Sequence, residues 1–124
     1  MTYPVTLAES LAVIGVIDPD AYTAGTVYTA AIEMNRVNQL IAIVSIGEIT
    51  GDGTVNFALQ QSATSDGSYT TITDKAITEV VTTGDKQVVV SLDASEIGTD
   101  KPFVKGNLTT AVAAVDVGVV ILGS

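Results

Sequence analysis

The stretch that most constrains the fold is residues 39–61, where two apolar runs flank a turn rich in Gly and Asp. The run at 40–46 has too many β-branched residues for a comfortable helix, and the run at 54–60 alternates strictly between apolar and polar residues. The Gly and Asp residues of the segment between them, 47–53, supply positive-φ positions and side-chain caps, which favours a chain reversal. We therefore predict a β-hairpin at the centre of a sheet.

Three residues of the second run, Val55, Phe57 and Leu59, are predicted to enter the core. The chain is 47% hydrophobic but only 5% aromatic, so most of its core must consist of small side chains such as Val, Ile and Ala. Such residues suit closely packed sheets. A chain of 124 residues is predicted to form a single domain, residues 1–124, in which residues 1–10 are an extended N-terminal arm.

Charge and residue types exclude several classes of function. The chain has five Lys and Arg against 14 Asp and Glu, and this net charge of -9 repels nucleic acids and anionic membrane surfaces. Cys and His are absent, which excludes disulfides, thiolate metal sites and a histidine base. There is no basic leader segment and no apolar run long enough to span a bilayer, so we expect a soluble protein made in a cytoplasm.

The N-terminal third of the chain leaves two alternatives open. Residues 11–17 form an apolar run that ends at Asp18-Pro19-Asp20, which favours an edge strand, with a short helical turn as the alternative. Residues 26–34 alternate like a strand with Ile32 and Met34 turned inward, although a helical stripe also fits this region. We favour a strand at both places.

The remainder of the chain is predicted to consist of short strands. They are expected at residues 69–72, 75–81, 86–92, 103–109 and 115–122. Asp93, with an acidic residue three positions later, predicts a capped helical turn after the third of these. About eight strands at this spacing predict an all-β fold, an antiparallel β-sandwich resembling a jelly roll.

No group of residues indicates catalysis or cofactor binding. Most acidic residues lie beside Gly, Pro or Thr in turns, where Asp side chains bond to the backbone. Asp18, Asp20 and Asp52 are candidate calcium ligands, but no stretch matches a calcium-binding loop. The Gly51-Asp52-Gly53 turn lacks the Lys and hydroxyl residue that follow a phosphate-binding loop. We predict no enzyme activity, no metal and no cofactor.

Several strands carry apolar residues on both faces. Val27, Val89, Val120 and Leu122 lie opposite the neighbours assigned to the core. Loops and sandwich ends cover such residues in one interpretation, and in the other they form a contact between subunits.

Five groups of residues give the chain a resemblance to a known family. They are Tyr3-Pro4-Val5-Thr6-Leu7-Ala8-Glu9, Ile17-Asp18-Pro19-Asp20-Ala21-Tyr22, Ile32-Glu33-Met34, Val55-Asn56-Phe57-Ala58-Leu59-Gln60-Gln61 with the following Ser65-Asp66-Gly67, and Val104-Lys105-Gly106. Together they resemble the small structural proteins of tailed phages that are encoded near the major capsid protein.

The resemblance implies a capsid decoration (cement) protein of the virion, a β-sandwich that binds the outer surface of the phage major capsid protein shell and stabilises the head. It also implies a homo-oligomer, most simply a trimer at local threefold positions. The matching motifs are strand and turn patterns, so no site residues carry over. The alternative is a receptor- or carbohydrate-binding module of a tail or fibre, for which the chain offers four Tyr and no Trp.

The N-terminal arm provides the candidate partner-binding residues, which are Thr2, Tyr3, Pro4, Val5 and Leu7. These side chains are too apolar for a free tail, while the short length and Pro4 disfavour a stable element formed alone. We expect residues 2–8 to contact the capsid or a neighbouring subunit and to become ordered on binding.

Overall fold

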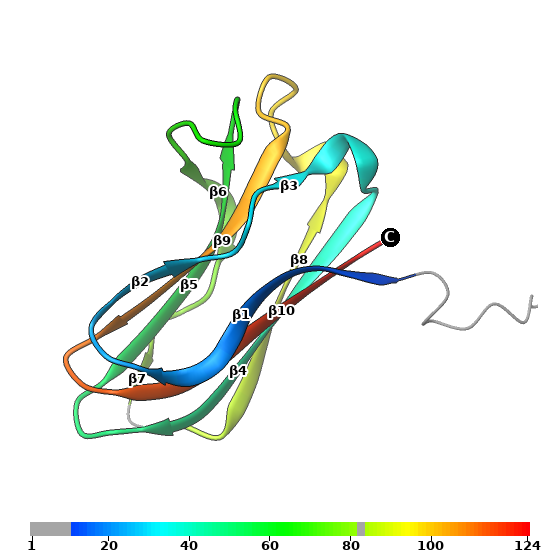
Figure 1. Ribbon diagram of the computed structural model, residues 1–124. Helices are drawn as coiled ribbons and strands as arrows, with labels where there is room; N and C mark the ends of the chain where they lie inside the picture. The colour runs from blue at the N-terminus through cyan, green and yellow to red at the C-terminus, as the bar shows by residue number, and fades with distance from the viewer. Residues whose placement is uncertain (1–10, 82–83) are drawn as a thin grey trace, which may run out of the picture.

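The computed structural model describes residues 11–81 and 84–124, which form two antiparallel β-sheets packed face to face (Figure 1). The predicted all-β class and the β-sandwich are confirmed. These described residues contain ten strands where about eight were expected, because the segments predicted as single strands at 26–34 and 75–81 are each divided between two strands. The N-terminal arm, with the candidate residues Thr2, Tyr3, Pro4, Val5 and Leu7, lies outside the described residues.

Each sheet has a defined strand order. Sheet A contains, from edge to edge, β1 (Ala12–Tyr22), β10 (Val115–Gly123), β4 (Gln39–Ile49) and β8 (Lys86–Asp93). Sheet B contains β2 (Gly25–Tyr28), β9 (Phe103–Ala111), β5 (Thr54–Ser62) and β6 (Thr70–Ala76), with β3 (Ile32–Glu33) paired to β9 and β7 (Val80–Val81) paired to β5. Two single-turn 3-10 helices, η1 (Met34–Arg36) and η2 (Ala94–Glu96), complete the fold.

The core is a single apolar layer between the two sheets. Its buried side chains include Val55, Phe57 and Leu59 of β5, which confirms the predicted core positions. The Phe57 ring lies against Gly106 of β9, where an added Cβ would come within 2.9 Å of two ring atoms. Glycine at this position therefore makes the space that the largest core side chain occupies.

The predicted hairpin over residues 39–61 is wrong, although both of its strands exist. β4 lies in sheet A between β10 and β8, whereas β5 lies in sheet B between β9 and β6. The connecting turn crosses from one sheet to the other. In this turn the Gly53 amide donates to the Thr50 carbonyl at 3.0 Å, and Gly51 has a φ of +53°. The apolar faces of the two strands meet across the core rather than side by side.

The first strand extends further than predicted. β1 was expected to end at Asp18-Pro19-Asp20, but it continues to Tyr22 through a bulge between Ile17 and Asp20. β1 is an edge strand, as predicted, and Pro19 lies in its bulge, so the missing amide hydrogen of proline interrupts no regular pairing.

The predicted continuous strand over residues 26–34 is divided into β2 and β3, followed by η1. Ile32 and Met34 are buried as expected, but Tyr28 faces solvent and Thr29 is buried. The cause is a pair of bonds to Gly106: the Thr29 amide donates to its carbonyl at 3.0 Å, and the Thr29 hydroxyl accepts from its amide at 2.9 Å. These bonds turn the backbone, so the side chains that face the core change here from one set of alternate positions to the other.

The later strands agree more closely with the prediction. β8, β9 and β10 cover the predicted segments at 86–92, 103–109 and 115–122. The predicted break between 69–72 and 75–81 is wrong, because β6 runs unbroken from Thr70 to Ala76, with Asp74 at a φ of 63° where the pairing with β5 shifts. Asp tolerates this conformation better than most residues.

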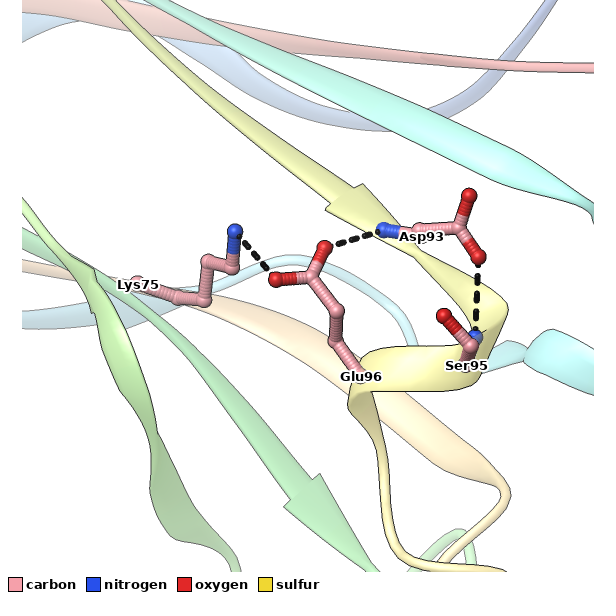
Figure 2. Close-up of polar contacts among 4 residues, drawn as sticks. All are labelled: Lys75, Asp93, Ser95 and Glu96. Carbon is pink, nitrogen blue, oxygen red and sulfur yellow. Dashed lines mark hydrogen bonds and ion pairs between the residues drawn. The ribbon is translucent and has the colours of Figure 1, made fainter.

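The predicted cap at Asp93 is confirmed and joins the two sheets at one edge (Figure 2). The Ser95 amide donates to the Asp93 carboxylate at 3.0 Å, and the Asp93 amide donates to Glu96 at 2.9 Å. Lys75 of β6 pairs with the other Glu96 oxygen at 2.8 Å. Hydrogen bonds from Lys75 and from the Asp93 backbone lower the pKa of Glu96, and the Ser95 amide lowers that of Asp93.

Replacing Phe57 by Ala should remove about 3 to 5 kcal/mol from the free energy of unfolding, because a large buried ring is lost and the cavity left beside Gly106 has little to fill it. Denaturant unfolding measures this change. A loss below about 1 kcal/mol would contradict the assigned core position.

The Glu96 interactions should make stability depend on pH. Because the folded-state pKa of Glu96 is lowered, its contribution is present above the unfolded value of about 4.3 and is lost as the pH falls through the folded value. Glu96→Gln keeps an acceptor for the Asp93 amide but loses the charge that pairs with Lys75. Its melting temperature should lie below that of the unaltered protein near pH 7, and the difference should shrink as the pH falls below the unfolded pKa and through the folded one. A difference that stays constant as the pH is lowered would refute this account.

Candidate interaction surface

The two outer faces of the sandwich differ in chemistry. Side chains that are paired across neighbouring strands point to the same side of a sheet, so the pairing register shows which residues share an outer face. In sheet A, Val16 is opposite Val120, Val120 is opposite Ile43, and Ile43 is opposite Val89. One apolar row therefore crosses all four strands on the side away from the core.

A second apolar row lies beside the first. Val13 is opposite Leu122, which is opposite Ile41. We call the two rows together the A face, and its residues are Val13, Val16, Ile41, Ile43, Val89, Val120 and Leu122. Four of them are among the most exposed apolar side chains in the described chain, at 60% for Val13, 45% for Val16, 53% for Val89 and 39% for Val120. Scattered exposed valines are ordinary, but two adjacent rows form a contiguous patch.

The outer face of sheet B is polar by the same test. Thr26 is opposite Thr109, which is opposite Asn56, and Lys105 is opposite Gln60, which is opposite Thr71. Asn56 donates to Glu79 at 2.8 Å, and the Thr26 and Thr109 hydroxyls lie 3.2 Å apart. A surface of hydroxyls and amides that bond to one another is well suited to water.

A hollow of about 610 Å³ adjoins the A face where β1 bulges. Val16 and Val120 line it from the apolar row, Asp20 and Asp116 line it from the side, and Ser45 of β4 also contributes. Two glycines of its lining allow close approach of neighbouring strands: a Cβ on Gly118 would lie 3.0 Å from the Cα of Pro19, and one on Gly47 would lie 3.3 Å from the Cβ of Asp116. The two central strands therefore contribute backbone to the hollow at these positions.

The edge of this hollow is acidic. Asp20 and Asp116 are both exposed, and neither takes part in an ion pair within the part of the chain that the structure describes. The Asp20 carboxylate accepts a hydrogen bond from the Ala21 amide at 2.8 Å, which leaves Asp116 as the carboxylate on the outer side of β10. Partial burial, with the charges of Asp20 and Asp18, raises the pKa of Tyr22, which lies at the end of the same strand. Asp85 and Lys86 line a neighbouring depression that shares Ser45 with the hollow.

One aromatic cluster lies on sheet B. The Lys105 ammonium is 3.9 Å from the centre of the Tyr28 ring and 4.2 Å from that of Tyr69. Burial, followed by the charge of Asp66, raises the pKa of Tyr69. Because the lysine already occupies a face of each ring, the pair offers less free aromatic surface for stacking on a sugar. The carbohydrate-binding alternative stays a prediction.

The structure agrees only in part with the surface residues expected from the sequence. Val89, Val120 and Leu122 lie on the A face, whereas Val27 packs against the core and its neighbour Tyr28 is the exposed residue. The sequence analysis missed four members of the A face, which are Val13, Val16, Ile41 and Ile43. The available signal was the density of apolar residues on both sides of residues 11–17 and 40–46.

Across residues 11–81 and 84–124, no three His, Cys, Asp or Glu side chains gather as metal ligands would. The described part of the chain also has no helix with the length and apolar character needed to cross a membrane.

The chain was compared with known proteins by its sequence. A scan against models of protein families found no match, and a search of curated proteins found no match either.

Proposed function

We propose that the protein is a structural protein of a phage virion that decorates the capsid, binding the outer surface of the major capsid protein shell and stabilising the head. The observation that carries this proposal is the contrast between the two outer faces. An apolar A face on one side and a polar surface on the other suit a protein with one side against a partner and the other in water.

The resemblance of the sequence motifs supplies the identity of the partner. A phage shell offers a large protein surface on which many copies bind, so each copy needs one face directed at the shell. The net charge of -9 supports a place outside the shell, away from DNA. As part of the same proposal, the protein has no enzymatic role, and its copies on the head form a homo-oligomer, most simply a trimer.

Polar substitution of the A face should weaken attachment. Val16→Thr combined with Val120→Thr keeps the shape and the β propensity of both side chains, but it would place two hydroxyls in an apolar contact. We expect a loss of about 2 kcal/mol in binding, close to thirtyfold in affinity, measured by co-sedimentation with undecorated heads of the phage whose genome encodes the chain.

Val81→Thr is the matched control, because Val81 is 43% exposed but lies on β7 of sheet B. It should bind like the unaltered protein. All three proteins should melt at similar temperatures, since the substituted valines are exposed. Equal binding by the double variant and the control would remove the A face from the proposal, and absence of binding by the unaltered protein would refute the decoration role.

The N-terminal arm forms a second part of the proposed attachment. Deleting residues 2–8 should leave the melting temperature nearly unchanged, because residues 11–81 and 84–124 already supply a continuous apolar core, but it should weaken binding to heads. Loss of the apolar side chains of Tyr3, Val5 and Leu7 from a contact provides the physical reason. Full-strength binding by the shortened protein would show that the arm is no anchor.

A further inference from the structure

We infer that the hollow beside the A face receives an apolar side chain from a segment of another protein, and that this segment carries a Lys or Arg that pairs with Asp20 and Asp116. The inference rests on the proposed function, because it describes the chemistry of the partner at the same face. The apolar residues that line the hollow favour an apolar side chain, and the acidic residues at its edge favour a basic one.

The apolar half follows from the lining. The hollow of about 610 Å³ is continuous with the A face, since Val16 and Val120 belong to both. Gly47 and Gly118 contribute backbone in place of side chains to its lining, and Ser45 adds a single hydroxyl. A partner side chain placed there would be buried against valines and backbone, which favours an aliphatic group.

The charged half follows from the rim. Asp20 and Asp116 form no ion pair with any residue that the structure describes. Among the residues that line this hollow and the depression beside it, Lys86 is the one positive charge near these carboxylates. A basic group that approaches the rim gains attraction from two carboxylates, whereas an acidic segment is repelled.

The chain itself is a poor source of that basic segment. Residues 1–10 contain no Lys or Arg and include Glu9, so the N-terminal arm does not fit the rim. Of the five cations in the sequence, Lys75 pairs with Glu96, Arg36 lies 3.5 Å from Glu33, and Lys105 is held by two tyrosine rings. Lys86 lies beside the hollow itself, which leaves Lys101. A second copy would offer mainly acidic surface to an acidic rim, which favours a different protein as the occupant.

The charge requirement is tested by Asp20→Asn combined with Asp116→Asn, compared with Asp66→Asn combined with Asp100→Asn. Both pairs are exposed and remove the same net charge, but the second pair lies in loops that do not line the hollow. In co-sedimentation with undecorated heads, the first pair should bind about tenfold more weakly and with less dependence on salt, and the second should match the unaltered protein. Equal weakening by both pairs would leave only a general charge effect and overturn the inference.

The occupant is tested directly by Ser45→Cys, labelled with a photoactivatable benzophenone maleimide. The native chain has no cysteine, so the label has one attachment site. After illumination on heads, the cross-linked peptide should come from another protein and contain Lys or Arg within about two residues of the attachment point. Cross-linking to a second copy, or to a segment without a basic residue, would overturn the inference. Unaltered protein that fails to bind heads would instead refute the proposed function.

Discussion

The structure depends on one shared layer of apolar side chains between two sheets. Since consecutive strands mostly lie in opposite sheets, β4 and β5 contribute Val44 and Phe57 to the same core from two sheets rather than pairing as neighbours. Each strand has two faces, so burial of the inner face leaves an outer face whose composition the core does not determine. The outer face of sheet B carries hydroxyls and amides. That of sheet A carries two rows of valine, isoleucine and leucine, with Ser45, Gln87 and Ser91 beside them. The contrast between these faces is the basis of the functional proposal.

Strand positions could be predicted from the sequence, but strand partners could not. The alternation of Val55, Phe57 and Leu59 identified a strand with one buried face. The Gly-rich turn before it is equally compatible with a hairpin and with a crossing between sheets, because both need a reversal and positive φ. The choice between them depends on β9 and β10, which are distant in sequence and take the positions beside β5 and β4. At Thr29, bonds to Gly106 override the local alternation in the same way.

The surface was predictable to a similar degree. Val89, Val120 and Leu122 could be recognised as second-face residues from their own strands, but their assembly with Val16 and Ile43 into rows depends on register across four strands. The hollow was not predictable, since it requires Gly118, Gly47 and the bulge at Pro19 to come together from three strands. Single glycines and isolated carboxylates in a sequence do not show that their strands will lie side by side in the fold.

The central claim is that the outer face of sheet A, and not that of sheet B, contacts the partner. Hydroxyl-radical footprinting of the protein free and bound to heads tests it most directly, because the method reports the solvent access of side chains. On binding, oxidation should fall in the peptides that contain Val13 and Val16 and in those that contain Val120 and Leu122, while Tyr28 keeps its reactivity. Protection of Tyr28 and Tyr69 with unchanged oxidation of these valine-containing peptides would contradict the account.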